Sequence, residues 1–285
     1  MPVSPDRVRR AAVALAACAS VVLVAGCASA PSQTARRSLV DAERAFASMA
    51  TERGIRAAFI DNFADDGVGF NPAPYRLREA WSGRPLPADP KALTLAWHPV
   101  IADVARSGAL GFTAGPSLFV DTTGSRPAVQ GVYFSMWRRD AAGRWKVVAD
   151  AGIETPRALV DADFGADPIV SAPPLFIAAV PGLDAADAGA SGTVAAFAAA
   201  LAEDARWHVD GRFPIFGRVA IVAARSGDAR ALRFVTQGRE AATTGDLGYT
   251  FGAIQSEGTP AGHYLHMWTR GGDGAWRLSV AVHLP

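Results

Sequence analysis

Residues 131–145 read GVYFSMWRRDAAGRW, and residues 262–276 read GHYLHMWTRGGDGAW. In both stretches a run of strand-forming residues ends in a turn that contains glycine, which is typical of a β-hairpin. The residues that recur at a fixed spacing are Gly131 and Gly262, Tyr133 and Tyr264, Met136 and Met267, Trp137 and Trp268, Arg139 and Arg270, Gly143 and Gly274, and Trp145 and Trp276. Such self-similarity predicts two related units in tandem.

The repeat extends toward the N-terminus of each unit. Residues 107–115 (SGALGFTAG) match residues 244–252 (TGDLGYTFG), and a weaker match lies upstream of both. In the first unit, apolar residues at helical spacing occupy residues 39–49, and a second helix is expected up to about Phe63. We expect strands at about 94–106, 111–120, 129–139 and 144–153. Helices followed by a long antiparallel sheet predict an α+β fold.

The segments ERAFASMATERGIRAAFIDNFADDGVGF, WHPVIADVARSGALGFTAG and GVYFSMWRRDAAGRWKVV resemble the SnoaL-like branch of the nuclear-transport-factor-two-like superfamily, in particular its secreted bacterial domains of unknown function. The resemblance implies two cone-shaped domains, each a curved antiparallel sheet wrapped around N-terminal helices. It also implies that the two domains pack on each other as a pseudo-dimer within one monomeric chain. The expected boundaries are a first domain at 38–153, a linker at 154–192 and a second, shortened domain at 193–285.

The N-terminus has the pattern of a secretory signal. Three arginines precede an apolar run of residues 11–24, which is shorter than the roughly 20 residues that cross a bilayer as a helix. Val24-Ala25-Gly26-Cys27 resembles the lipobox of bacterial lipoproteins, which implies cleavage after residue 26 and lipidation of Cys27. Residues 27–37 would then form a tether. We expect an envelope protein that faces the periplasm and is held in the outer membrane through the lipid on Cys27.

Composition excludes several classes of function. The chain has 28 Lys+Arg and 27 Asp+Glu, and this balance argues against a nucleic-acid partner. Only two cysteines are present, one of which would leave with the signal peptide while the other would carry lipid. The sequence therefore offers no thiol for catalysis or zinc binding, and it contains no phosphate-binding or dinucleotide-binding motif. We expect no cofactor and no metal.

The histidines do not suggest a metal site either. His263 and His266 are three residues apart on an expected strand, so their side chains point to opposite faces. His266 and His283 share a face, but the simple hairpin register places them about 13 Å apart at the usual rise per residue. His98 stands alone in the sequence.

Two acids are weak catalytic candidates because acid–base enzymes of this superfamily hold a carboxylate in an apolar cone. Asp103 is expected to share a strand face with Trp97 and Ile101, and Glu240 occupies the equivalent position in the second copy. The alternative is a solvated acid near the end of a strand. The hairpin register also predicts that Tyr133 lies opposite Asp150, although that acid becomes alanine in the second copy.

Aromatic residues are the remaining candidates for a ligand pocket. They are Phe70, Tyr75, Trp81 and Trp97 in the first copy, and Trp207, Phe213 and Phe234 in the second, with core packing as the alternative role for each. The function that we favour is non-catalytic binding of a small apolar molecule in a cone. The alternatives are an acid–base isomerase, cyclase or dehydratase of the ketosteroid-isomerase type, and a purely structural or protein-binding lipoprotein.

Overall fold

The computed structural model describes residues 30–85, 87–164, 182–227, 230–270 and 272–285. The predicted signal peptide and Cys27 lie outside the described residues, as does the part of the predicted linker at 165–181. Among the helices that the structure describes, none is long and apolar enough to span a membrane.

The first domain consists of three helices and a seven-stranded sheet. Its elements are α1 (Ala30–Arg53), α2 (Ile55–Asn62), β1 (Phe63–Phe70), β2 (Pro74–Arg76), α3 (Leu77–Ser82), β3 (Leu93–Trp97), β4 (Ile101–Val104), β5 (Leu110–Asp121), β6 (Val129–Arg139) and β7 (Trp145–Glu154), followed by the short 3-10 helix η2 (Asp161–Phe164). The strands lie in the order β2-β1-β7-β6-β5-β3, and β4 also pairs with β5.

The second domain repeats this plan. Its elements are α4 (Leu183–Gly189), α5 (Val194–Ala200), β8 (Leu201–Val209), β9 (Ile215–Phe216), α6 (Arg218–Ser226), β10 (Leu232–Ala241), β11 (Leu247–Ser256), β12 (Thr259–Arg270) and β13 (Trp276–Leu284). The strand order is β10-β11-β12-β13-β8-β9. In both domains the first strand runs parallel to the last one, β1 beside β7 and β8 beside β13. The tandem α+β fold is therefore as the repeat predicted.

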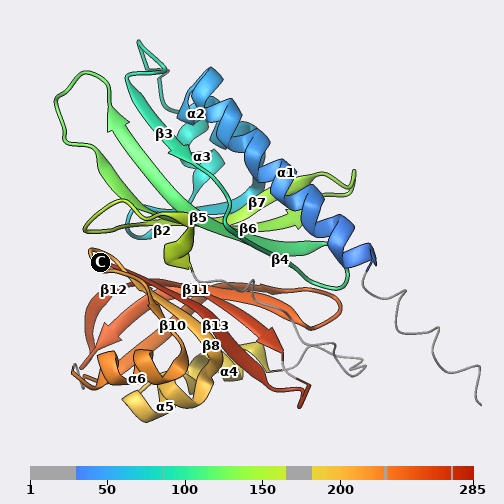
Figure 1. Cartoon of the computed structure of the whole chain (residues 1–285), viewed down its shortest axis with the longest axis vertical. Helices are drawn as coiled ribbons and strands as arrows, with labels where there is room; N and C mark the ends of the chain where they lie inside the picture. The colour runs from blue at the N-terminus through green and yellow to red at the C-terminus, as the bar shows by residue number, and fades with distance from the viewer. Residues whose placement is uncertain (1–29, 86, 165–181, 228–229, 271) are drawn as a thin grey trace, which may run out of the picture.

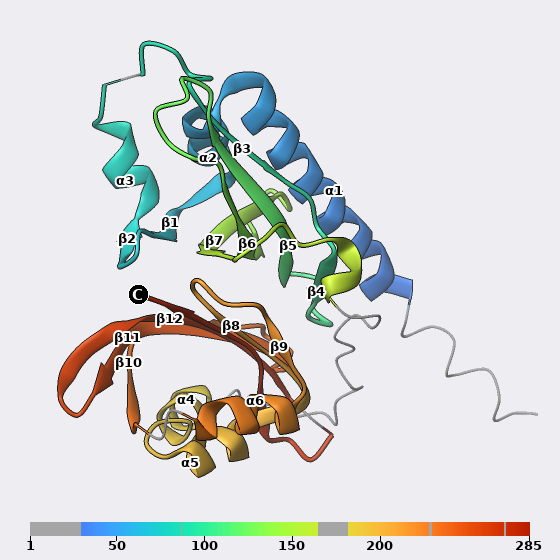
Figure 2. The ribbon, with the colours of Figure 1, turned by 60° about the vertical axis from the view of Figure 1, so that its left-hand side comes forward.

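The two sheets pack face to face, and the helices cover their outer sides (Figures 1 and 2). One apolar cluster joins the domains, and it includes Phe112, Phe134 and Met136 from the first sheet with Leu265 and Met267 from the second. The opposite face of each sheet has its own cluster with the helices of that domain. Each sheet is thus buried on both faces, which explains why neither face of β6 or β12 is polar along its length.

Repeated glycines mark places where a strand approaches its neighbour too closely for a side chain. A Cβ atom on Gly131 would lie 2.1 Å from the carbonyl oxygen of Ile153, and one on Gly262 would lie 2.1 Å from that of Leu284. The two glycines occupy equivalent positions at the start of the hairpin in each domain. Their recurrence therefore follows from the same close approach of the neighbouring strand in both sheets.

Three expectations about element boundaries need correction. The strand expected at 94–106 is interrupted, because β3 ends at Trp97 and β4 begins at Ile101. The segment 30–37, expected as tether, belongs to α1. The segment expected as linker contains α4, which packs against β10 and β11. The second domain has therefore kept a short counterpart of the first helix.

Candidate functional site

In the first domain a carboxylate from α1 is buried against the sheet. Glu43 is fully buried, and its carboxylate accepts a hydrogen bond from Trp97 Nε1 (2.5 Å) and one from Trp137 Nε1 (3.0 Å). The Thr113 hydroxyl also donates to Glu43, and Trp137 Nε1 lies 3.1 Å from that hydroxyl oxygen. Burial raises the pKa of Glu43 to about 7, against the lowering effect of these donors.

The second domain has an equivalent carboxylate on α4. Asp187 is fully buried and accepts four hydrogen bonds, from Thr236 Oγ1 (2.7 Å), Thr250 Oγ1 (2.8 Å), Tyr264 OH (2.6 Å) and His266 Nδ1 (3.1 Å). Although burial opposes its ionisation, the bonds from His266, Tyr264 and Thr236 outweigh burial and lower its pKa. Asp187 is therefore a saturated, ionised acid.

The two acids are bound by repeated residues. Thr113 and Thr250 occur at the same place in the repeat, and so do Trp137 and Trp268. Trp268 Nε1 donates to the Thr250 hydroxyl at 2.9 Å, as Trp137 does to Thr113. Sequence analysis missed both acids. The signal for Glu43 was its spacing, because it lies four residues after Leu39 and three before Phe46 on the apolar stripe of α1.

A chain of hydrogen bonds continues from Asp187 through two imidazoles. His266 Nε2 lies 3.2 Å from His283 Nε2, and Trp207 Nε1 donates to His283 Nδ1 at 3.2 Å. The separation of about 13 Å expected between the two histidines is wrong. Arg270 pairs with Trp276, one residue beyond the simple register, and the pairing shifts by one more residue between Met267 and Trp268, so that His266 lies opposite Ala281 and diagonal to His283. The residues that the structure describes contain no group of three or more potential metal ligands.

The hydrogen bonds along this series of side chains determine the tautomers of both imidazoles. An indole N–H can only donate, so His283 Nδ1 accepts and the His283 proton lies on Nε2. That proton is donated to His266 Nε2, which leaves the His266 proton on Nδ1, facing Asp187. Burial lowers the pKa of His283 well below its usual range, with smaller contributions from the neighbouring His266 and from Arg225, which agrees with a neutral ring. Neither imidazole has a nitrogen left for a ligand.

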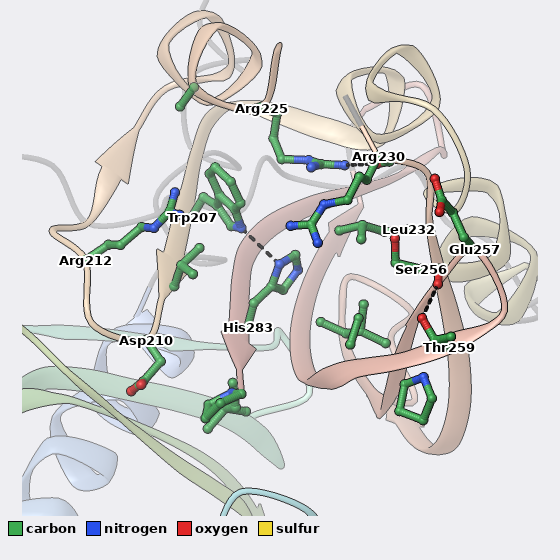
Figure 3. A pocket seen from close by; sticks show the side chains of 17 residues that line it. Trp207, Asp210, Arg212, Arg225, Arg230, Leu232, Ser256, Glu257, Thr259 and His283 are labelled. Atoms are coloured by element: carbon green, nitrogen blue, oxygen red, sulfur yellow. Dashed lines mark hydrogen bonds between the residues drawn. The ribbon is translucent and has the colours of Figure 1, made fainter. Parts of the chain in front are cut away.

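His283 and Trp207 form one wall of a cavity of about 460 Å³ in the second cone. Figure 3 shows the bond between them and the guanidinium groups of Arg212, Arg225 and Arg230 around the space. The cavity is therefore polar at its walls.

The cavity of the first cone differs from it in chemistry. It measures about 360 Å³, and four of the aromatic residues proposed from the sequence line it together, namely Phe70, Tyr75, Trp81 and Trp97. Phe46, Phe59 and Leu77 add to its apolar surface. Trp81 stacks on Phe59 with ring centroids 5.4 Å apart. This is an apolar pocket of the size that holds a small molecule.

Two polar groups of the sheet face this apolar space. Asp150 accepts a hydrogen bond from Ser135 Oγ at 2.6 Å and has no other one among the described residues. The hydroxyl of Tyr133, which is 7% exposed, makes no hydrogen bond of normal geometry in the part of the chain that the structure describes, and the Thr113 side chain near it is already bonded to Glu43 and Trp137. Burial raises the pKa of Asp150 to about 6 and that of Tyr133 well above its usual range.

The predicted register between these residues needs correction. Tyr133 lies opposite Gly152, and Asp150 lies opposite Ser135, because Arg139 pairs with Trp145 and a shift follows between Met136 and Trp137. Both side chains nevertheless lie on the face that lines the cone.

Asp103 and Glu240 do not line either cavity. Asp103 pairs with Phe112 and Glu240 with Tyr249, and both aromatic partners belong to the cluster between the domains. The shared face expected for Trp97 and Asp103 is wrong because the strand breaks between them. Glu240 accepts hydrogen bonds from Arg138 Nη1 (2.8 Å) and Tyr249 OH (3.2 Å), so it ties the first sheet to the second.

The remaining candidates are also separated from the cavities. Phe213 is 45% exposed beneath the guanidinium of Arg157, and Phe234 packs on the rings of Tyr264 and His266 in the core of the second cone. His98 is exposed and lies 2.7 Å from Asp161.

No family model matches this chain, and no curated protein matches it. Several solved structures are similar to parts of it. An NTF2-like protein of unknown function from Pseudomonas putida KT2440 is 14% identical, with 42% of this chain and 87% of that chain covered and a TM-score of 0.34. A ketosteroid isomerase-like protein from Erwinia carotovora atroseptica SCRI1043 is 17% identical, with coverages of 40% and 92% and a TM-score of 0.31. An NTF2-like protein with a cystatin-like fold from Novosphingobium aromaticivorans is 18% identical, with coverages of 46% and 84% and a TM-score of 0.33.

Proposed function

We propose that the first cone binds a small, mainly apolar molecule that carries one hydroxyl or carbonyl oxygen. The observation that supports this is the combination of an apolar cavity of about 360 Å³ with a Tyr133 hydroxyl that lacks a partner and an Asp150 carboxylate with spare acceptor capacity. A buried polar group without a partner is costly, and a ligand oxygen would remove that cost.

The contrast with the second cone supports the same assignment. There, all four nitrogens of His266 and His283 are engaged, and Asp187 accepts four hydrogen bonds. The buried acid and the two imidazoles of the second cone are thus engaged with their neighbours, whereas Tyr133 and Asp150 in the first cone have capacity for a ligand.

The probe for this function is 2-naphthol, with naphthalene as its counterpart without a hydroxyl. We expect Tyr133→Phe to weaken binding of 2-naphthol by about 2- to 13-fold, which corresponds to one neutral hydrogen bond. Asp150→Asn is expected to weaken it by about 10-fold or more, because a bond to a charged acceptor is stronger. Naphthalene should bind all variants equally. Titration monitored by naphthol fluorescence measures the affinity for 2-naphthol, and displacement of 2-naphthol measures the affinity for naphthalene.

Tyr249→Phe is the matched control, since Tyr249 is also a buried strand tyrosine but lies between the domains. It should leave both affinities unchanged. The affinity of the wild-type protein for 2-naphthol should also fall below about pH 6, as Asp150 becomes protonated, and that of Asp150→Asn should not. Equal losses of affinity for naphthol and naphthalene would contradict the proposal.

A second function, acid–base catalysis, is favoured by the raised pKa of Asp150. A carboxylate with a pKa of about 6 beside a tyrosine hydroxyl is a stronger base than an ordinary aspartate and remains ionised at neutral pH. It could remove a proton next to a carbonyl whose oxygen accepts a hydrogen bond from Tyr133. In that case 2-tetralone should exchange its α-protons with deuterated water faster when the protein is present, as measured by NMR. Asp150→Asn should remove the acceleration. An exchange rate that the wild-type protein does not change would contradict catalysis and leave ligand binding as the function of this cavity.

A further inference from the structure

A second apolar cavity adjoins the cone cavity of the first domain. It measures about 550 Å³, and Trp81, Pro85, Pro90, Leu93 and Phe119 form its apolar walls. Leu93 is 38% exposed, so the cavity is a groove at the surface of the domain. The charged residues that line it are Arg56, Arg84 and Asp89.

The groove and the cone cavity share part of their walls. Ile55, Asn71, Trp81 and Phe119 line both. Three of these four side chains are apolar, so the two cavities meet at a common, mainly apolar wall. A molecule that extends from the cone past this wall would meet a second apolar surface.

A set of hydrogen bonds and a close backbone approach position the wall of the groove. The guanidinium of Arg56 donates to the carbonyl oxygens of Trp81 (2.6 Å), Arg84 (2.6 Å) and Pro85 (2.5 Å). At the break between α1 and α2, a Cβ atom on Gly54 would lie 2.5 Å from the carbonyl oxygen of Pro90, and Gly54 has a φ of +86°. Glycine at this position allows the segment around Pro90 to approach the break between the two helices closely. The cationic group nearest the shared wall is thus occupied by backbone carbonyls.

We propose that the ligand is a long-chain alcohol, whose hydroxyl accepts a hydrogen bond from Tyr133 and donates one to Asp150, and whose apolar tail leaves the cone and lies along this groove. The inference rests on the function proposed above and adds the class of molecule. The polar groups with capacity for a ligand are at the inner end of the path, and the surface from Trp81 to Leu93 is mainly apolar. An apolar tail in the groove would remove this exposed surface from water.

The test uses straight-chain 1-alkanols from pentanol to undecanol, which displace 2-naphthol from the full-length protein. Each added CH2 that enters apolar surroundings should tighten binding about fourfold, which is the effect of burying one methylene. We expect this increase to continue beyond the length that fills the cone. Leu93→Asp should weaken the longer alkanols about tenfold and leave the shortest unchanged, because only a long tail reaches residue 93.

Leu118→Asp is the matched control. Leu118 is 39% exposed, lies on the strand that pairs with β3 and lines neither cavity. It should leave every affinity unchanged. If affinity stops rising at a short chain length, or if Leu93→Asp affects all chain lengths equally, the groove does not hold the tail. The loss of 2-naphthol binding in Tyr133→Phe would then still support the site in the cone, so the two proposals fail separately.

Discussion

Replacing Asp187 by alanine is expected to lower the free energy of unfolding by about 3–5 kcal/mol, the range found when one member of a buried charged network is removed. The variant would remove the shared acceptor of Thr250 and Tyr264, which are fully buried, and of Thr236, which is partly buried. It would also leave His266 Nδ1–H unpaired. Each buried donor without a partner costs about 1–3 kcal/mol, and rearrangement among the four would recover part of the sum.

Urea denaturation followed by far-UV circular dichroism measures this loss. Asp184→Ala is the control, because Asp184 is on the same helix but is half-exposed, and its ion pair with Arg239 is on the surface. Such a pair contributes about 0–1 kcal/mol. A loss of less than about 1 kcal/mol for Asp187→Ala would show that water or a rearranged side chain satisfies the four donors. The role of Asp187 as the anchor of α4 would then be wrong.

The sequence predicted the tandem of two α+β domains because the repeated residues have strict geometric roles. Gly131 and Gly262 are required by close backbone contacts, and Trp137 and Trp268 both reach a threonine on the neighbouring strand. Residues with such roles recur at fixed spacing, and spacing is what a sequence displays directly. The aromatic lining of the first cone was predicted from residue type instead of spacing, since large apolar side chains of a small domain line its core or a pocket.

The positions of the polar side chains were harder to predict because strand register depends on irregularities. In each hairpin the pairing shifts by one residue before the repeated tryptophan, between Met136 and Trp137 and between Met267 and Trp268. A shift of this kind moves every later pair along the partner strand. It accounts for the misplaced partner of Asp150 and for the unexpected contact between the two buried histidines.

The helix acids were missed for another reason. An acid on the apolar side of a helix looks like an interruption of the pattern, although here it is the group that attaches the helix to the sheet. Asp187 stands in a segment rich in alanine, glycine and aspartate, whose composition is typical of a linker. The role of either acid depends on hydrogen-bond donors on the facing strands, which are far away in sequence.

Burial of His208 should make the protein less stable in acid. His208 is on β8, is 1% exposed and packs on Phe134 of the first domain with ring centroids 4.6 Å apart. Neither ring nitrogen has a hydrogen-bond partner among the described residues. Burial, with a smaller contribution from Arg206, lowers its pKa to about 3. The ring is therefore neutral in the folded protein throughout the mildly acidic range.

The sign of the pH effect follows from this lowered pKa. Between about pH 6.5, the usual pKa of histidine, and pH 3, the unfolded chain binds a proton at His208 that the folded protein does not. Stability then falls by about 1.4 kcal/mol for each pH unit below 6.5. At pH 4.5 the loss from this residue should reach about 2.7 kcal/mol. The full contribution of a neutral His208 is kept above pH 6.5.

Urea denaturation at pH 7.5 and pH 4.5 separates this effect from packing. From pH 7.5 to pH 4.5 the free energy of unfolding should fall by about 2.7 kcal/mol less in His208→Leu than in the wild-type protein, because leucine binds no proton. Phe134→Leu is the control, since it alters the same ring contact without removing a titratable group and should leave the difference between the two pH values unchanged. If His208→Leu and the wild-type protein lose stability in parallel, His208 is protonated in the folded state and the domain interface has room for its charge.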